Sequence, residues 1–503
     1  MEKCALVSIF AKEGVENLVR TIEKAGYRIL STGGTLEYLR NLNVQADNVE
    51  ELTRFPEAPG GRVKTLHPAI FAGILARRDN EEDLRYLEQN RIPLIDFVIV
   101  NLYPFSDKRD LDLDSLLEFI DIGGISLIRA AAKNFKWVTL VCDPSDYNFV
   151  AEAISIGTLS EEVRLGLALK GFEKVVEYDS IIHEELSRRY SREAEFRAFI
   201  FRKSQELRYG ENPHQKGSVY LNALGKHSFL RNIEILNGIE LSYNNILDAY
   251  SSWNVVSEFS EDACAIIKHN IPCGVGIAEN LGEAYEKALK GDEVSAYGGI
   301  VALNGIVEDR LAELLNEFFF EVVIARDFTD KALEVLRRKK KRRILRVRKD
   351  LRNELEYRFI DEDLLIQQKD IKPLTPEALN VVSGTLEFKR VSDIIFGDKV
   401  IKHVKSNAIV VVKDGMTVGI GGGQTSRVDA VKIALEKAGE RAKDAVLVSD
   451  GFFPFTDSID LAYQHGVKIV VEPGGSVRDQ DVIDRAKELG ITLVFTGLRR
   501  FRH

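Results

Sequence analysis

The sequence predicts an α/β protein built from at least two domains. The first ~190 residues alternate short apolar runs with amphipathic helical patterns, which is typical of a parallel, doubly wound sheet. The remainder repeats one strand–turn–strand–helix layout, which predicts two related α/β subdomains. A length of 503 residues fits two to four domains and provides enough chain for sizeable cores.

The N-terminal region contains the alternating elements of the predicted parallel sheet. In chain order they are strand 4–10, helix 14–26, strand 27–32, strand 96–105, helix 125–134 and strand 137–143. Ligands of such sheets bind outside the carboxyl ends of the strands. Polar residues follow three of the strands, namely Ser8 with Lys12, the segment 32–35, and Asn101. We therefore expect a binding site at this edge of the sheet.

A charged, strongly helical stretch at 160–203 follows the last of these strands. We place a domain boundary inside it, within 190–200. This gives an N-terminal domain of residues 1–195 and a C-terminal domain of residues 196–503.

The C-terminal domain contains a weak internal duplication. Residues 265–290 and 408–438 share the order strand, turn, "VGI" strand and helix, and residues 294–305 have a counterpart at 447–458. The expected subdomains span approximately 200–370 and 371–503.

The overall composition narrows the class of protein. A net charge of −9 disfavours a dedicated nucleic-acid binder, because such proteins are usually basic. The four cysteines form no CxxC pair, which indicates neither a zinc ribbon nor a thioredoxin-like site and fits a reducing cytosol. The apolar stretch at the N-terminus is too short for a signal peptide, and no run reaches transmembrane length. These features predict a soluble, cytoplasmic protein that binds neither nucleic acid nor membrane.

The strongest run of charge is "RRKKKRRILRVRK" at 337–349. One interpretation is a nucleic-acid or localisation patch. The interpretation we favour is a solvated helix end and connector, because the total charge is acidic and Ile, Leu and Val interrupt the run.

Three glycine-containing segments of the N-terminal region predict binding of a phosphate. "GGRVKTLHP" at 60–68 combines flexible glycines with Arg62 and Lys64, a guanidinium fork and a point charge. "STGGT" at 31–35 and "DIGGISLIRAAAKN" at 121–134 each open a helix, where free backbone N–H groups attract anions. The first segment alone also fits a solvated basic loop. Together the three favour a nucleotide-sized phosphate ligand.

The C-terminal domain has three further polar clusters. "LRYGENPHQ" at 207–215 is denser in hydrogen-bonding side chains than an ordinary turn needs, although a structural turn stays an alternative. "VGIGGGQTSRVDAV" at 418–431 fails the GxGxxG dinucleotide pattern at Gln424, but its helix start suits an anion or amide. "SDGFFPFTD" at 449–457 fits either a stacking surface for a flat ring or core packing.

"AIIKHNIPCGVGIA" at 265–278 places Lys268 and His269 where a buried strand ends. A metal site is disfavoured because His269 has no local His or carboxylate partner. A Cys273 nucleophile would need an activated thiolate. Acid–base chemistry by the Lys–His pair is the interpretation we favour, since imidazole titrates near neutrality and an adjacent ammonium stabilises a developing oxyanion. The remaining alternative is a structural pair, a hydrogen-bonded histidine beside a lysine whose ammonium reaches solvent.

Together these motifs resemble the bifunctional family that joins AICAR transformylase to IMP cyclohydrolase in purine biosynthesis. The resemblance covers nearly the whole chain, and its segments occur in the family's order: "GGRVKTLHP", "NLYPF", "DIGG…LIRAAAKN", "RYGENPHQ", "KH…PCG", "SNAI", "GIGGGQTSR", "SDGFFPF" and "LRRFRH". It implies a methylglyoxal-synthase-like N-terminal domain that closes FAICAR to IMP. It also implies a C-terminal transformylase of two cytidine-deaminase-like subdomains without the deaminase zinc.

The resemblance further implies the chemistry and its residues. The formyl donor would be 10-formyltetrahydrofolate, no metal or redox cofactor would be needed, and the protein would be a homodimer with transformylase sites across the interface. The implied catalytic residues are Lys64, Tyr103, Asp121 and Lys133 for cyclisation and Lys268 and His269 for formyl transfer. The implied substrate-binding residues are Ser8, Lys12, Thr32, Gly33, Gly34, Thr35, Arg62, Thr65, Asn101, Gly123, Gly124, Arg208, Tyr209, Asn407, Arg427, Phe455 and Asp457.

Two segments depart from the family pattern. Where the family often reads "SVSDK", this chain has Phe10 in place of a hydroxyl and Ala11 in place of a carboxylate. Asn270 and Ile271 replace the commoner x-Asn of "KHxNPCG". Two other functions are alternatives. One is a nucleotide-sensing or RNA-binding module that uses the basic run, and the other is a zinc nucleoside deaminase, which would require a Cys/His triad that the sequence lacks.

Overall fold

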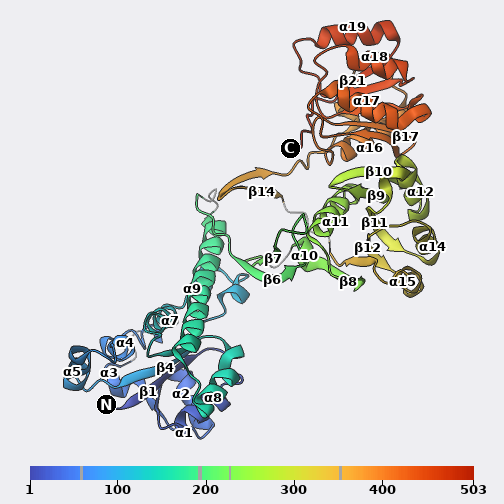
Figure 1. The fold of residues 1–503 in the computed structure, drawn as a ribbon. Coiled ribbons are helices and arrows are strands. Elements are labelled where there is room, and N and C mark those ends of the chain that lie inside the picture. The colour runs from blue at the N-terminus through green and yellow to red at the C-terminus, as the bar shows by residue number, and fades with distance from the viewer. Residues whose placement is uncertain (57–60, 191–194, 226–227, 350–353) are drawn as a thin grey trace. The chain divides into compact units, whose positions relative to one another are not determined.

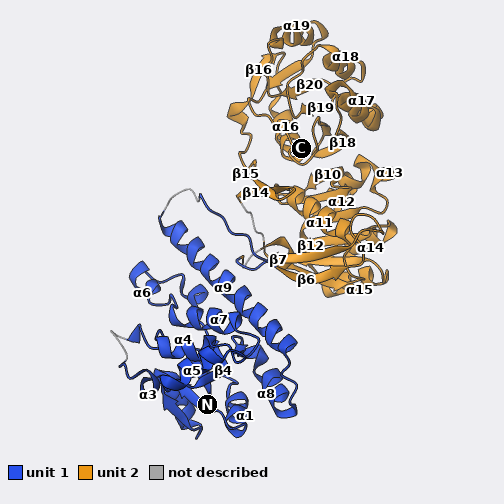
Figure 2. Ribbon diagram, turned by 60° about the vertical axis from the view of Figure 1, so that its left-hand side comes forward, with its two compact units in different colours: residues 1–201, 222–224 blue, residues 202–221, 225–503 orange. Residues whose placement is uncertain are grey.

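The computed structural model describes residues 1–56, 61–190, 195–225, 228–349 and 354–503. These residues form two compact units, one of residues 1–201 and 222–224 and the other of residues 202–221 and 225–503 (Figure 2). Gly60 of the first glycine segment and residues 191–194 of the expected boundary lie outside the described residues.

The first unit is built on one five-stranded sheet in the order β3-β2-β1-β4-β5, with every neighbouring pair parallel. Figure 1 shows β1 and β4 of this sheet with helices around them. Its strands are β1 (Lys3–Ile9), β2 (Arg28–Ser31), β3 (Ala46–Asn48), β4 (Leu94–Asn101) and β5 (Thr139–Val141). Its helices are α1 (Glu16–Lys24), α2 (Gly33–Asn41), α3 (Val49–Thr53), α4 (Pro68–Leu75), α5 (Glu81–Gln89), α6 (Leu113–Leu117), α7 (Gly123–Lys133), α8 (Tyr147–Ile156) and α9 (Glu161–Tyr190). The predicted parallel sheet is confirmed.

Both faces of this sheet are buried. Successive residues of β1 alternate between two cores, so that Cys4 and Leu6 pack with α4, α7 and α9 while Ala5 and Val7 pack with α1, α2 and α8. A strand covered on both faces has no need of alternating polar residues, which explains its continuous apolar run. Polar residues that belong to the strands are therefore expected mainly at the strand ends.

The second unit is built on a twelve-stranded sheet in the order β16-β21-β20-β19-β17-β18-β10-β9-β11-β12-β13-β8. Its strands, with the two small hairpins β6–β7 and β14–β15, are β6 (Phe201–Leu207), β7 (Gly217–Asn222), β8 (Ile233–Asn237), β9 (Asp262–Lys268), β10 (Ile271–Ala278), β11 (Ile300–Val307), β12 (Val322–Phe328), β13 (Arg343–Val347), β14 (Leu355–Ile360), β15 (Asp363–Gln368), β16 (Asn380–Ser383), β17 (Ile409–Lys413), β18 (Met416–Gly421), β19 (Val446–Ser449), β20 (Ile469–Glu472) and β21 (Thr492–Phe495). Its helices are α10 (Phe229–Asn232), α11 (Tyr243–Val256), α12 (Leu281–Gly291), α13 (Glu293–Ala296), α14 (Asp309–Glu317), α15 (Asp330–Arg337), α16 (Val391–Ile401), α17 (Arg427–Ala438), α18 (Asp457–Gln464) and α19 (Asp479–Leu489).

The two halves of this sheet repeat one topology. Outward from the central β10–β18 pair, the orders β10-β9-β11-β12-β13-β8 and β18-β17-β19-β20-β21-β16 match, and so do their parallel and antiparallel pairings. One core lies beneath α11 and α16 and is shared by the halves, whereas the opposite face has a separate core in each half. The predicted duplicated α/β architecture is confirmed.

The repeated glycines of the "VGI" strands permit close packing of a helix on each half. An added Cβ at Gly274 of β10 would lie 1.9 Å from the carbonyl oxygen of Ala288 in α12. An added Cβ at Gly419 of β18 would lie 2.0 Å from the carbonyl oxygen of Ala434 in α17. Gly276 and Gly421 face α12 and α17 in the same way. These glycines therefore permit close helix–strand packing rather than forming a dinucleotide-binding loop.

The basic run at 337–349 is only partly the solvated connector that we favoured. It begins at the end of α15 and continues as β13, in which Arg343 is 6% exposed. Arg342, immediately before that strand, is 3% exposed and donates to carbonyl oxygens of Leu315 and Phe318. The aliphatic residues that interrupt the run are the apolar side chains of this buried strand. In the part of the chain described, we find no helix with the length and apolarity needed to cross a bilayer.

Candidate active sites

A pocket of about 740 Å³ lies at the carboxyl ends of β1, β2 and β4 in the first unit. The strand order reverses between β1 and β4, which is the position where open α/β sheets bind ligands. The pocket is lined by the predicted residues Ser8, Lys12, Thr32, Gly34, Thr35, Arg62, Lys64, Thr65, Asn101, Tyr103, Asp121, Gly123 and Gly124. The structure thus brings together residues spread over more than a hundred positions of the sequence.

Two helix N-termini and one cationic loop meet at this pocket. Helix α2 starts at Gly33, and the ammonium nitrogen of Lys64 lies 3.1 Å from where a Cβ on that glycine would be. Helix α7 starts at Gly123, and the hydroxyl of the buried Thr65 lies 3.1 Å from the corresponding position there. Helix N-termini and a nearby ammonium both favour an anionic ligand.

Asp121 is held at the start of α7 and is largely shielded from water. Its Oδ1 accepts a hydrogen bond of 2.6 Å from the N–H of Gly124, and its own N–H donates to the Tyr178 hydroxyl at 2.9 Å. Burial raises the pKa of the Asp121 carboxyl, against the lowering effect of backbone N–H groups of Gly124 and Tyr103. A carboxyl with a raised pKa beside an anion pocket is suited to moving a proton.

Some predicted ligand residues use their polar groups within the protein. The Asn101 side chain accepts from the N–H groups of Phe10 and Ala11 at 2.6 and 3.0 Å and donates to the Ala11 carbonyl. The Thr35 hydroxyl exchanges hydrogen bonds with the backbone of Ile9. These two residues shape the loop after β1 and so position Lys12. Phe10, which replaces a hydroxyl, packs edge-on against the Tyr103 ring with centroids 5.4 Å apart.

Two predicted residues of the first unit do not line the pocket, namely Gly33, where α2 starts beside it, and Lys133. Lys133 is the more distant in its helix. It is the last residue of α7, whose first residues line the pocket, and its side chain is exposed. The buried residue at this end of the helix is Asn134, which donates to carbonyl oxygens of Ile74 and Ala76. Arg62 does reach the pocket and pairs there with Glu118.

In the second unit, the remaining predicted residues lie along one edge of the long sheet, meaning the row of strand ends on one side of it. Because β10 and β18 are antiparallel, the start of β10 and the end of β18 lie at the same edge. The β9–β10 turn with Lys268 and His269 is therefore at the edge where β18, β19 and β20 end. The starts of β11, β12 and β13 lie at this edge too, through their pairings from β9 outward.

The Lys–His pair occupies a two-residue hairpin turn. Lys268 pairs with Ile271, and His269 and Asn270 between them have φ angles of 54° and 61°. Positive φ at both central residues is the requirement of a type I′ turn, the usual two-residue hairpin. The Lys268 ammonium donates to the Tyr297 carbonyl at 2.9 Å, while the His269 imidazole is exposed.

Arg427 contacts one other predicted residue, Asn407, and two residues around the end of β19. Its buried guanidinium donates to Asn407 Oδ1 at 3.0 Å, to Asp450 Oδ1 at 3.1 Å and to the Phe452 carbonyl at 3.2 Å. Phe455, on the loop after β19, is 54% exposed, and its ring lies 5.2 Å from the Arg478 guanidinium. Arg427 thus supports the loop that carries Phe455 and the exposed Asp457, and it faces inward rather than toward solvent.

Glu472 at the end of β20 is a buried carboxyl that the sequence motifs do not single out. It is fully buried, its Oε2 accepts from the Phe453 N–H at 2.5 Å, and its Oε1 has no hydrogen-bond partner among the described residues. Burial raises its pKa to about 8, with Asp479 adding to the effect and Arg427 opposing it. Its position as a polar residue ending an apolar strand is the signal that could have found it.

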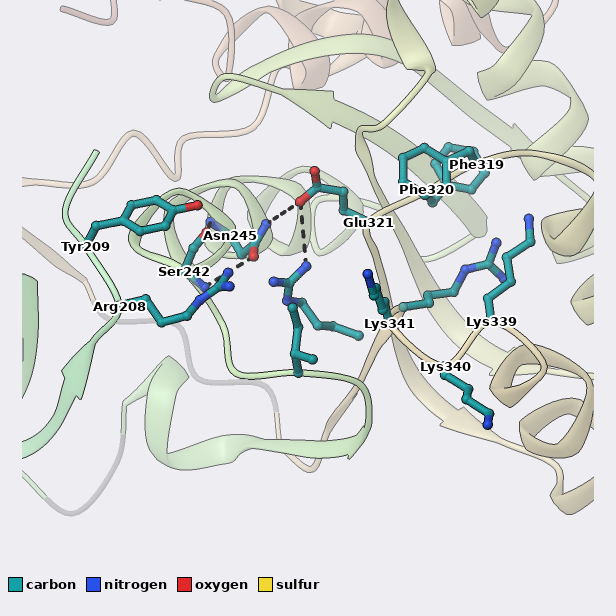
Figure 3. Close-up of a pocket in the computed structure, with 13 residues that line it drawn as sticks. Arg208, Tyr209, Ser242, Asn245, Phe319, Phe320, Glu321, Lys339, Lys340 and Lys341 are labelled. Atoms are coloured by element: carbon teal, nitrogen blue, oxygen red, sulfur yellow. Dashed lines mark hydrogen bonds and ion pairs between the residues drawn. The ribbon is translucent and has the colours of Figure 1, made fainter. Parts of the chain in front are cut away.

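Arg208 and Tyr209 line a second pocket of about 510 Å³ at the same edge. Figure 3 shows them on one side of it, with three lysines on the other and Glu321 between. Glu321 accepts from Asn245 at 3.1 Å and lies 3.7 Å from the Arg343 guanidinium. The sequence reasoning missed the other polar lining residues Ser242, Asn245, Glu321, Lys339, Lys340, Lys341, Arg342 and Arg343. The excess of cations suits a phosphate.

The geometry disfavours two of the three alternatives to acid–base chemistry, the thiol nucleophile and the metal site. The Cys273 thiol is 9% exposed, and burial raises its pKa to about 11, the opposite of an activated thiolate. Across the described ranges, no three His, Cys, Asp or Glu side chains are arranged to hold a metal ion.

The fold and the residues clustered in each unit define a two-unit α/β protein with one candidate active site in each unit. The profile of the MGS-like domain matches residues 14–126, and that of the AICARFT/IMPCHase bienzyme matches residues 131–437. Proteins named bifunctional purine biosynthesis protein PurH, from Thermoanaerobacter sp. strain X514, Clostridium botulinum strain Loch Maree and Caldicellulosiruptor bescii, are each 45% identical to this chain over 100% of both sequences. The crystal structure of ForH is 33% identical over 38% of this chain and 100% of its own, with a TM-score of 0.35, too low to support an inference.

The chain belongs to the AICARFT/IMPCHase bienzyme family. It is accordingly a bifunctional enzyme of purine biosynthesis, as the sequence motifs predicted. Its two reactions are formyl transfer to AICAR, which gives FAICAR, and the dehydrative ring closure of FAICAR to IMP.

Proposed function

We propose that the two reactions are divided between the two units and that 10-formyltetrahydrofolate supplies the formyl group. Ring closure belongs to the pocket at the carboxyl ends of β1, β2 and β4. Formyl transfer belongs to the sheet edge that carries Lys268 and His269. The observation that carries this division is the clustering of the predicted residues into separate sites, one in each compact unit.

In formyl transfer, the 5-amino group of AICAR attacks the formyl carbon. This amine is electron-poor, so alignment of the reactants in a preorganised site must supply much of the rate. The exposed imidazole of His269 takes the proton of the attacking nitrogen. The Lys268 ammonium, oriented by the Tyr297 carbonyl, stabilises the tetrahedral oxyanion or protonates the departing folate nitrogen.

Substrate binding at this edge follows from charge and shape. The cationic pocket of Arg208 and the lysines suits the nucleotide phosphate. The exposed ring of Phe455 suits stacking against a flat heteroaromatic group, with Asn407, Arg427 and Asp457 shaping or lining the surroundings.

In ring closure, the carboxamide nitrogen of FAICAR attacks its formyl group and water leaves. The nucleotide phosphate is held by the starts of α2 and α7 together with Lys12 and Arg62. Lys64, with backbone N–H groups near Gly124, stabilises the oxyanion. Asp121 and Tyr103 move the protons, and the raised pKa of Asp121 supports that role. The exposed position of Lys133 gives no support to a part for it within one chain.

The protein is proposed to act in the cytoplasm as a homodimer whose transformylase sites are completed across the subunit interface. Support comes from apolar surface on and beside the β14–β15 hairpin, where Ile360, Leu365 and Ile371 are 50%, 60% and 61% exposed. Apolar side chains clustered in this way are typical of surfaces covered by another chain. Sedimentation equilibrium at micromolar concentration tests the dimer.

The assignment of the reactions is tested with purified protein in two assays. Conversion of AICAR and 10-formyltetrahydrofolate to IMP is followed by absorbance, and FAICAR is supplied directly to isolate ring closure. Lys64→Ala is expected to lower ring closure by about 10²-fold or more, as the loss of an oxyanion-stabilising group does, and to leave formyl transfer intact. Equal loss of both activities would mean that the Lys64 site is misassigned.

A further inference from the structure

The turn that carries Lys268 and His269 is held by a carboxylate from a neighbouring helix. Asp248 of α11 accepts a 2.7 Å hydrogen bond from the N–H of Asn270 at Oδ1 and also accepts from the N–H of His269. Ser251, one turn further along α11, donates its hydroxyl to Asn270 Oδ1 at 2.8 Å. The two turn residues with positive φ are therefore both tied to one helix.

The second half of the sheet contains the same arrangement without the Lys–His pair. Asp414 and Gly415, the central residues of the β17–β18 turn, have φ angles of 52° and 72°. Their N–H groups donate to the two carboxylate oxygens of Asp393 in α16 at 3.3 and 2.9 Å. In each half the aspartate precedes the lysine before the turn, Lys268 or Lys413, by 20 residues.

Because the arrangement occurs in both halves, comparing Asp248 with Asp393 distinguishes a contribution to the fold from a contribution to catalysis. Both aspartates accept hydrogen bonds from the N–H groups of a tight turn. The positive φ angles of that turn are uncommon for residues other than glycine. The β17–β18 turn lies at the opposite edge of the sheet, since β10 and β18 are antiparallel, and it places Asp414 where the first half has His269. Asp393 thus has the structural contact of Asp248 without the candidate catalytic pair.

We propose that Asp248 is a positioning residue for formyl transfer, which holds the 268–270 turn so that Lys268 and His269 are presented together at the sheet edge. This inference rests on the proposed roles of those two residues. Asp248 touches the turn through its carboxylate and the backbone N–H groups of His269 and Asn270, so it acts on alignment of the imidazole and not on the substrate. Removing it should lower the turnover number without weakening nucleotide binding.

The test compares Asp248→Ala with the matched control Asp393→Ala in the full-length protein. We expect Asp248→Ala to lower kcat of formyl transfer by about 10²-fold, the usual effect of misplacing a reacting group by about 1 Å. The KM for AICAR should change by less than about threefold. Asp393→Ala should lower the melting temperature to a similar degree but keep kcat within about threefold of the original. FAICAR cyclisation, in the other unit, reports that each protein is intact.

Two further variants make every outcome decisive. Equal losses of kcat in Asp248→Ala and Asp393→Ala, or a change in KM alone, would overturn the inference in favour of a general structural role. If Asp248→Ala does not fold, Asp248→Asn decides, because its one remaining acceptor oxygen should give an intermediate kcat, and an unchanged kcat overturns the inference. His269→Ala distinguishes failure of this inference from failure of the proposed function. If His269→Ala is inactive in formyl transfer while Asp248→Ala is fully active, only the positioning role of Asp248 is wrong. If His269→Ala is itself fully active, the proposed function of the pair fails.

Discussion

The Cys273 thiol and the His269 imidazole lie in one short segment but in opposite environments. The thiol is 9% exposed, and burial raises its pKa to about 11, whereas the imidazole is exposed at the tip of a hairpin. A thiol that stays protonated at neutral pH is a poor nucleophile. This contrast supports the proposal that His269 and its neighbour Lys268, rather than the thiol, carry the chemistry of this segment.

Substitutions at these three positions separate the thiol from the acid–base hypothesis. His269→Ala should lower formyl transfer by about 10²- to 10⁴-fold, the usual contribution of a general base, with AICAR affinity retained. Lys268→Arg should also be poorly tolerated, because guanidinium does not readily release a proton. Cys273→Ser should cost far less. Steady-state rates and AICAR binding measured side by side check this, and an inactive Cys273→Ser beside an active His269→Ala would restore the thiol hypothesis.

Glu472 predicts a pH dependence of stability. Its pKa is raised from 4.5 to about 8 in the folded protein. Below pH 4.5 the carboxyl is protonated in both states, but between the two values only the unfolded state loses the proton. Stability therefore falls as pH rises through this window, by up to about 1.4 kcal/mol per pH unit, and the loss levels off above about pH 8.

Glu472→Gln removes this titration while keeping an oxygen to accept the Phe453 N–H. The melting temperature of the variant relative to the original protein should therefore be higher at pH 8 than at pH 5.5. Thermal melts at both pH values measure the difference. The same offset at the two pH values would show that Glu472 does not hold its proton in the folded state.

At the scale of elements, the two halves of the second unit are shaped by helices packed directly on glycine-bearing strands. An added Cβ at Gly421 would lie 2.1 Å from the carbonyl oxygen of Ala430, which is backbone and can yield only if α17 moves. Overpacking of this kind typically costs about 1 to 3 kcal/mol. Since α17 also carries Arg427 at its first residue, a displaced helix would disturb the loops at the sheet edge proposed for formyl transfer.

Gly421→Ala should therefore lower the thermal stability of formyl transfer while FAICAR cyclisation keeps its normal heat resistance. Gly166→Ala in α9 is the control for the substitution itself, because a Cβ there meets no atom within 4 Å. In an exposed helix interior alanine is favoured over glycine by roughly 0.5 to 1 kcal/mol. Residual activities after graded heating compare the two. A loss in Gly421→Ala no larger than in Gly166→Ala would contradict the packing argument.

At the scale of the whole molecule, each unit has its own sheet and its own cores. A fragment of residues 1–195 contains every strand of the first sheet and should cyclise FAICAR without formylating AICAR. The physical reason is that the pocket residues of that unit come from this segment alone. Activity assays are read together with a thermal melt. A fragment that melts cooperatively but has no cyclisation activity would refute the division of reactions between the units.

The sequence by itself predicted sheet strands of the first unit from their apolar runs, and it predicted functional residues at the ends of those strands. Apolar runs ending in Ser8, Asn101 and Lys268 predicted strands with functional residues at their ends, because a strand buried on both faces leaves only its ends for polar groups. The repeated "VGI" layout predicted the duplication, since the same helix–strand packing needs the same glycines. Motif order predicted the family before any contact was known.

Only the tertiary structure decided how those residues work together. The contacts of Asp248 with the 269–270 turn, of Glu321 with Asn245, and of Glu472 with Phe453 join segments whose separation in the chain carries no local pattern. The tertiary structure likewise places part of the basic run in the buried strand β13, and it engages the Asn101 side chain with the backbone of Ala11. Periodicity records which face of an element is apolar, whereas the partner of a polar side chain depends on which distant element packs against it.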